Sequence, residues 1–287
     1  MNKVLLLDAY NLIYRARYSG MNKGDHSTIF NFFRGLRPLI EKFDPDIAYF
    51  VLEGKPVKRL NMNADYKGQR VYHNNDGFNE QRKEILKIVE EHFPMFIVKH
   101  NDYECDDVIN HLAVKVHHQD DVTIISSDTD FIQSVSDRVK LYNPVRKKYI
   151  DGTDYDYVEW KSLVGDNSDN IKGFKGIGDK RAKSLLETRE KLEEFLIKEN
   201  NREIFERNNF MIRFHDMSED QSDMLITFPR IDSQNWSTLK EKFKSMDFNS
   251  MTAKDKTWTK YVNTFNKLER NLENARSSLK QHHIAGA

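Results

Sequence analysis

Residues 3–8 of the chain, KVLLLD, place four consecutive apolar side chains directly before a carboxylate, Asp8. Three later segments repeat this pattern of a short apolar run followed by acidic residues. They are DIAYFVLE at 46–53, MFIVKHND at 95–102 and DVTIISSDTD at 121–130. Short, nearly continuous apolar runs are typical of strands that are buried on both faces of a parallel sheet.

Helical patterns separate these runs, at 27–43, 79–93 and 104–117. Strands that alternate with helices predict an α/β domain, with a mostly parallel sheet flanked by helices, over residues 1–154. The strand signal fades from about residue 155, so we expect a mainly helical part over 155–287.

The composition restricts the class of protein. The chain has 287 residues, with 45 Lys and Arg against 45 Asp and Glu, which argues against a uniformly basic nucleic-acid binder but not against local basic patches. Its single cysteine excludes an intrachain disulfide and a cysteine-based zinc site, and suits a reducing cytoplasm. The first apolar run is too short for a signal peptide, and no run is long enough to span a membrane. We therefore expect a cytoplasmic protein without membrane contact, and a monomer.

The acidic residues that follow the runs are expected to meet at one edge of the sheet, because sites in α/β sheets form beyond the carboxyl ends of the strands. The segment YECDD at 103–107 opens the helix after the third run and lies at the same edge. The acids concerned are Asp8, Glu53, Glu104, Asp106, Asp107, Asp128 and Asp130. So many carboxylates need counter-charge, and oxygen ligands without His or Cys suit Mg²⁺ or Mn²⁺. The alternative for any single acid is an ordinary loop residue or helix cap.

Five segments resemble the 5′-nuclease family, and they follow one another in the family's order. They are LLLDAYNLIYRA (5–16), YKGQR (66–70), YECDDVI (103–109), ISSDTDF (125–131) and GDNSDNIKGFKGIGDKRA (165–182). The family includes the 5′–3′ exonuclease domain of bacterial DNA polymerase I, flap endonucleases, and stand-alone bacteriophage 5′-nucleases with RNase H activity. No polymerase-like sequence follows, so we expect the bacteriophage enzymes to be the most similar.

The resemblance implies a PIN-like 5′-nuclease fold and two Mg²⁺ ions, with Mn²⁺ as a substitute. It assigns the first ion to Asp8, Glu53 and Asp106 and the second to Asp106, Asp128 and Asp130. Further acids would act directly or through bound water, namely Glu104, Asp107, Asp166 and Asp169. Glu53 departs from the family, which usually has Asp at this position.

A second motif predicts contact with duplex DNA. The segment GFKGIGDKRAKSLLE at 173–187 is typical of a helix–hairpin–helix, expected over 165–187, in which glycines permit a tight turn and a helix N-terminus faces phosphate. The residues predicted to contact DNA are Gly173, Lys175, Gly176, Gly178, Lys180 and Arg181. The resemblance also implies K⁺ at this hairpin. The alternative is a helix–turn–helix corner that serves only packing.

The connection over 54–78 has no clear period, and long connections of this kind are usually functional or disordered. The resemblance implies a helical arch that gates a single-stranded 5′ end. Tyr66 would then stack on a base, and Lys67 and Arg70 would reach the scissile phosphate. Without the resemblance, solvated surface residues would be the better interpretation.

Near the end of the sequence, the apolar residues of 255–281 recur at heptad-like spacing. We expect this helix to pack on the body of the protein. The alternative is a docking face for a replication partner such as a single-strand-binding protein.

Together these features predict a structure-specific 5′ nuclease of DNA replication and repair, acting as a flap endonuclease and 5′–3′ exonuclease with RNase H activity. Its substrates would be branched or nicked duplex DNA and RNA–DNA hybrids with a 5′ end. Two alternatives remain open at this point: an acidic-site nuclease that processes single-stranded RNA, and a non-catalytic protein that binds junctions.

Overall fold

The computed structural model describes residues 1–20, 24–70, 76–198, 200–229, 231–232 and 234–281. Its main element is a seven-stranded sheet in the order β6-β5-β4-β1-β2-β3-β9. The strands are β1 (Lys3–Asp8), β2 (Ile47–Val51), β3 (Phe96–Lys99), β4 (Asp121–Ile125), β5 (Val139–Asn143), β6 (Lys148–Ile150) and β9 (Leu225–Thr227). Strands β1 to β5 pair in parallel, and the edge strands β6 and β9 are antiparallel. The predicted mostly parallel sheet is thus confirmed.

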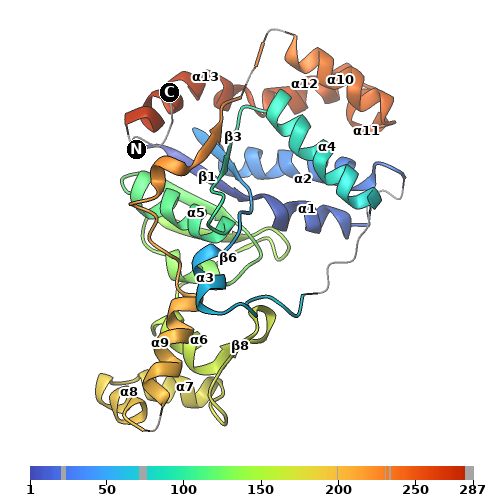
Figure 1. The fold of residues 1–287 in the computed structure, drawn as a ribbon. Coiled ribbons are helices and arrows are strands. Elements are labelled where there is room, and N and C mark those ends of the chain that lie inside the picture. The colour runs from blue at the N-terminus through green and yellow to red at the C-terminus, as the bar shows by residue number, and fades with distance from the viewer. Residues whose placement is uncertain (21–23, 71–75, 199, 230, 233, 282–287) are drawn as a thin grey trace.

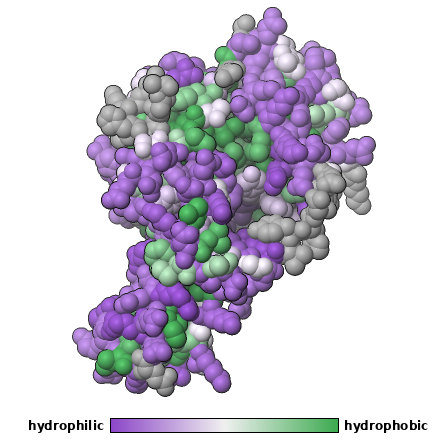
Figure 2. Space-filling model, in the orientation of Figure 1, coloured by the Kyte–Doolittle hydropathy of each residue, from purple (hydrophilic) through white to green (hydrophobic). Residues whose placement is uncertain are grey.

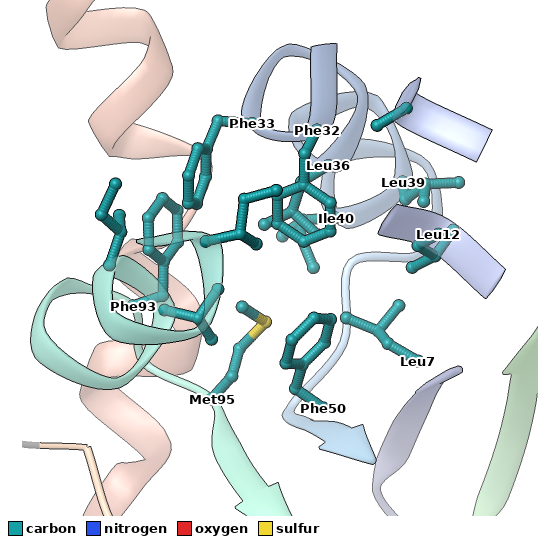
Figure 3. Close-up of a cluster of buried hydrophobic side chains, with 14 of the residues drawn as sticks. Leu7, Leu12, Phe32, Phe33, Leu36, Leu39, Ile40, Phe50, Phe93 and Met95 are labelled. Carbon is teal, nitrogen blue, oxygen red and sulfur yellow. The ribbon is translucent and has the colours of Figure 1, made fainter. Parts of the chain in front are cut away.

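Both faces of this sheet are covered, which explains why its central strands are apolar along their whole length. Leu5 and Leu7 of β1 join a core with the helices of one face, whereas Val4 and Leu6 join a second core on the other face. The first face carries α1 (Ala9–Arg17), α2 (Ser27–Phe43) and α4 (Asp76–His92), and the second carries α5 (Cys105–His111), which continues as a π-helical turn over Leu112–Val116. Figure 3 shows phenylalanines of α2 meeting Leu7, Phe50 and Phe93 in the first core.

A smaller lobe extends below the sheet in Figure 1 and has its own apolar cluster. It contains α6 (Tyr157–Val164), β7 (Gly165–Asp166), β8 (Ile171–Lys172), α7 (Asp179–Leu186), α8 (Arg189–Leu196) and α9 (Asn201–Ile212). The hairpin β7-β8 is tight at Gly173, where a Cβ atom would lie 2.2 Å from the carbonyl carbon of Val164. This glycine is therefore required by close backbone packing inside the lobe.

The chain does not remain in this lobe, so the prediction of one helical part over 155–287 was wrong. After α9 the chain returns to the sheet and adds β9 beside β3. It then forms α10 (Asn235–Ser245), α11 (Asn249–Thr252), α12 (Asp255–Asn263) and α13 (Asn266–Gln281). Helix α10 lies beside α4, and α13 packs along β2 near the chain termini in Figure 1. Since β9 is only three residues long, it has too few residues to show a strand period in the sequence.

The heptad-like segment 255–281 forms two helices rather than one, and both pack on the body as expected. Trp258 and Phe265 are buried in the same core as Phe33 and Phe93. The ring of Phe265 lies 5.0 Å from that of Phe93. Within the described residues, no helix combines the length and apolar character that crossing a bilayer requires.

We predict that Phe265→Ala lowers the free energy of unfolding by about 3–5 kcal/mol, because Phe265 is fully buried at the contact between the C-terminal helices and the sheet. Urea denaturation followed by circular dichroism measures this change. Ile197→Ala, at a side chain that is 74% exposed, is the matched control and should change it by less than about 0.5 kcal/mol. Equal stability of the two variants would contradict a shared core.

Candidate functional site

Four carboxylates, which we call the inner carboxylates, form the centre of the candidate site at the carboxyl edge of the sheet. Asp8 ends β1, Glu53 follows β2, Asp106 lies in the first turn of α5 and Asp128 follows β4. Strand β1 lies between β2 and β4. The helices that lead into β2 cover one face of the sheet, and the helix that leads into β4 covers the other face. The edge beside β1 is therefore a topological switch point, where sites form in α/β sheets. Asp8 is buried, Asp106 is half-buried, and Glu53 and Asp128 keep contact with solvent.

The inner carboxylates cannot all remain charged in this arrangement. Burial raises the pKa of Asp8 to about 6, and the charge of Asp128 adds to the rise. Burial, followed by the charges of Asp128, Asp8 and Glu53, raises the pKa of Asp106 well above its ordinary value. The pKa values of Glu53 and Asp128 are also raised, because protein atoms crowd each carboxyl group although each residue keeps solvent contact. The group therefore needs a cation from outside if it is to be fully ionised near neutral pH.

The five other predicted acids are neutralised by the chain itself. Arg59 pairs with Glu104 and Asp107, Lys67 with Glu104 and Asp169, Arg70 with Asp169, and Lys161 with Asp130 and Asp166. In contrast, no inner carboxylate forms an ion pair with a Lys or Arg of the described residues. The protein's cations thus surround the inner group without neutralising it.

The inner carboxylates fit divalent metal ions in charge and in donor type. They offer only oxygen donors, which suit hard ions such as Mg²⁺ and Mn²⁺. In the described part of the chain, however, no three acidic, His or Cys side chains stand close enough to form a ready-made cage for one ion. The fit therefore rests on the unmet negative charge and the oxygen donors.

An open pocket of about 410 Å³ lies beside the inner carboxylates and is lined by residues of both lobes. Asp106, Asp128 and Asp130 line it from the sheet, and Lys161, Asp166 and Asp169 line it from the smaller lobe, together with Lys67 and Arg70. Five of the nine predicted acids and both predicted cations therefore line this pocket, although they are spread over more than 100 residues of sequence.

Asp107 does not belong to this surface. It is fully buried, and its two oxygens accept hydrogen bonds from Arg59 Nη1 and Nη2 at 2.6 and 2.9 Å and from the backbone N–H of His215 at 2.8 Å. Its sequence position in the first turn of α5 gave no sign of this buried partner. We therefore leave Asp107 out of the proposed set of metal-binding residues.

The connection predicted as an arch is compact where the structure describes it. It forms a short helix, α3 (Val57–Met62), followed by turns up to residue 70, whereas residues 71–75 lie outside the described residues. Tyr66 is 5% exposed, and its hydroxyl oxygen lies 3.0 Å from a carboxylate oxygen of Glu104 and 3.0 Å from one of Asp169, either of which can accept its single proton. In this arrangement the ring of Tyr66 is covered by its own chain, and base stacking by Tyr66 stays a prediction.

The predicted DNA contacts lie on the outer surface of the smaller lobe, where Lys175, Lys180 and Arg181 are exposed. Gly178 is the N-cap of α7, and nothing lies within 4 Å of the position that its Cβ would occupy. Gly176 has a φ of 77°, which favours glycine. The visible face of this lobe is largely hydrophilic, as Figure 2 shows.

Sequence patterns did not point to two cations of the site. Lys161 is an isolated lysine in α6, and Arg59 is one of several basic residues in a segment without a period. Their acidic partners are up to 48 residues away in sequence, so no local spacing identifies them. Only the low exposure of their side chains, 12% and 4%, distinguishes them from surface charges.

Comparisons with known proteins agree with this fold. Residues 3–162 match the family model of the 5′-3′ exonuclease N-terminal resolvase-like domain, and residues 153–230 match that of the 5′-3′ exonuclease C-terminal SAM fold. The chain belongs to the 5′-3′ exonuclease family. It is 32% identical to the 5′-3′ exonuclease of Aquifex aeolicus over 207 residues, which cover 65% of this chain and 69% of the relative. It is also 32% identical to the DNA polymerase I of Chloroflexus aurantiacus over 209 residues. This match covers 64% of this chain but only 22% of that much longer protein.

Solved structures share the fold at lower identity. The bacteriophage T5 D15 protein, co-crystallised with metal ions, has a TM-score of 0.62 at 21% identity, covering 77% of this chain and 93% of that chain. Human GEN1 in complex with Holliday junction DNA has a TM-score of 0.57 at 17% identity, covering 93% and 73%. The mixed sheet flanked by helices and the helical lobe are therefore those of this nuclease family.

We predict that Lys161→Met increases the affinity for Mn²⁺ by about fivefold, the equivalent of about 1 kcal/mol. Its ammonium group lies between Asp130 and Asp166, at 2.6 Å from Asp166, and without it these carboxylates must be neutralised by ions from solution. Isothermal titration calorimetry measures this affinity. Lys115→Met, which breaks an exposed pair with Asp216, is the control and should leave it unchanged. Unchanged affinity in Lys161→Met as well would place the ions elsewhere.

Proposed function

We propose that the protein is a structure-specific 5′ nuclease that hydrolyses phosphodiester bonds near the 5′ end of branched or nicked DNA. The observation that carries the proposal is the division of the acids. Four carboxylates at the sheet edge form no ion pair with a Lys or Arg of the described residues, while Lys67, Arg70 and Lys161 pair with the acids around them. This distribution attracts metal ions at its centre and phosphate at its rim. Membership of the 5′-3′ exonuclease family supports the same reaction.

The proposed roles follow from the positions of the residues. Asp8, Glu53 and Asp106 would hold one divalent ion, and Asp106, Asp128 and Asp130 a second, with Glu104, Asp166 and Asp169 acting directly or through water. When bound, such ions polarise the phosphodiester and the attacking water and stabilise the leaving oxygen. We propose Mg²⁺ as the ion, with Mn²⁺ as a substitute.

Lys67 acts as a fixed positive charge in this proposal. Burial lowers the pKa of Lys67, but the charges of Glu104 and Asp169 outweigh this effect and leave the pKa raised. Lys67 is therefore an ammonium at neutral pH and cannot serve as a general base. A compact charge of this kind suits a phosphoryl oxygen that gains negative charge as water attacks.

The smaller lobe would hold duplex DNA by its backbone. The exposed N-terminus of α7, with Lys175, Lys180 and Arg181 near it, suits phosphate and carries no sequence information. We further propose that this hairpin binds K⁺ and that the protein also acts on RNA–DNA hybrids. We propose a cytoplasmic location as well, with which the single free cysteine is consistent. A solved complex of the bacteriophage T5 D15 flap endonuclease contains DNA and metal ions, which supports a DNA substrate.

Cleavage of labelled substrates tests the proposal. Flap, nicked and RNA-primed duplexes, labelled at either end, should be cut near the 5′ end in Mg²⁺ and remain intact in EDTA. Single-stranded RNA should be cut poorly, and preferential cleavage of it would favour an RNA-processing nuclease. Asp128→Asn should abolish cleavage but retain flap binding, because it removes one carboxylate of the inner group and relieves repulsion of phosphate. Binding without any wild-type cleavage would identify a non-catalytic junction binder.

Lys67→Ala should lower the single-turnover rate by about 10²–10³ fold, the scale for loss of one group that stabilises transition-state charge. Flap affinity in Ca²⁺ should fall far less, because the smaller lobe still holds the duplex. Lys55→Ala, at an exposed lysine of the same segment, is the matched control and should retain the rate. A proportional loss of affinity with an unchanged rate on bound substrate would limit Lys67 to DNA recruitment.

A further inference from the structure

Arg59 is a buried cation at the junction of three elements. Its side chain is 4% exposed, and every N–H group of its guanidinium has an acceptor. Nε donates to the carbonyl of Met211 at 2.9 Å, Nη1 to Glu104 at 2.8 Å and Asp107 at 2.6 Å, and Nη2 to Asp107 at 2.9 Å and the carbonyl of Arg213 at 3.0 Å. Arg59 thus ties α3 to the start of α5 and to the end of α9.

The contact with Glu104 connects Arg59 to the candidate site. Glu104 is 3% exposed. Its Oε2 atom accepts from Arg59 and from the hydroxyl of Tyr66, and its Oε1 atom accepts from the ammonium of Lys67. Because Arg59 holds one oxygen, the other is directed toward Lys67, whose own position is thereby fixed.

The contact with Asp107 acts on the first turn of α5. Glu104 is the N-cap of this helix, and its backbone N–H donates to Asp107 Oδ2 at 3.3 Å, as in a capping box. Arg59 binds both side chains of the box. Asp106, one of the inner carboxylates, lies between them in sequence, so Arg59 also fixes the turn that carries it.

We propose that Arg59 is a positioning residue of the nuclease site, which sets the place of Lys67 through Glu104. This inference rests on the proposed nuclease function. Arg59 does not face the pocket, so it acts on the reaction only through the residues that it holds. A lysine in its place keeps the charge but has three donors instead of five, and cannot reproduce the planar arrangement.

A double-mutant cycle between Arg59 and Lys67 tests this role. Arg59→Lys alone should lower the single-turnover rate on a labelled flap by about 10–10² fold, the scale for misplacing a group at the site. Flap affinity in Ca²⁺ should change by less than about threefold, because the outer surface of the smaller lobe is unaltered. In the Lys67→Ala background, Arg59→Lys should have a clearly smaller effect than it has alone, since Lys67 is already absent and only the turn that carries Asp106 is still held.

Two further measurements separate positioning from general stability. Fold retention of Arg59→Lys is checked by urea denaturation, and Arg59→Met combined with Asp107→Leu provides a second variant in which the buried charge pair is replaced by apolar groups. If this double variant is folded yet slow, positioning through Glu104 is supported, whereas a wild-type rate in either folded variant overturns it. Effects of Arg59→Lys and Lys67→Ala that multiply would also overturn it. Absence of wild-type cleavage would instead refute the proposed function, and this role with it.

Discussion

Mutual repulsion among carboxylates is the constraint on which this structure depends. Parallel strands end at the same edge, so acids that follow β1, β2 and β4 are brought together whatever their charges. The chain offsets this repulsion unequally. It supplies Arg59, Lys67, Arg70 and Lys161 to the surrounding acids and, among the described residues, no paired cation to Asp8, Glu53, Asp106 or Asp128. Stability alone would favour pairing every buried acid, including Asp8, with a cation, so the unequal distribution points to function.

The internal cations also hold the two lobes in register. Lys161 joins Asp130, which follows β4, to Asp166 of the smaller lobe, and Arg70 reaches Asp169 from the segment after α3. Hydrogen bonds from the side chain of Gln69 to the carbonyl of Asn167 and from that of Asn170 to the carbonyl of Asp65 lie beside these pairs. The smaller lobe, which would bind duplex DNA, is thus held against the candidate site by the same ion pairs that neutralise Asp130, Asp166 and Asp169. Salt and bound metal ions should therefore act on lobe geometry and on chemistry together.

Sequence patterns were sufficient for the sheet and its edge. KVLLLD and DVTIISSDTD contain both the strand and the acid that follows it, so topology alone places Asp8 near Asp128. Patterns failed where a role depends on a distant partner. The burial of Tyr66 was not expected: its hydroxyl lies 3.0 Å from oxygens of Glu104 and Asp169, 38 and 103 residues away, and its ring packs in an apolar cluster with Val158, Ile171, Met211 and Ile212. The three-residue strand β9 was missed because its pairing with β3, and not its own composition, makes it a strand.

The ion pair between Lys67 and Glu104 has a consequence for the binding of metal ions and DNA. A carboxylate that pairs with Lys67 is less negative toward a metal ion, and an ammonium that pairs with Glu104 is less available to a phosphate. In the proposed function, an ion that draws on Glu104 and a phosphate that draws on Lys67 would each weaken this pair. Once an ion draws on Glu104, Lys67 gains freedom to meet phosphate, and once phosphate takes Lys67, Glu104 gains charge for the ion. Because such coupling is reciprocal, metal and DNA should each increase the affinity for the other through this single ion pair.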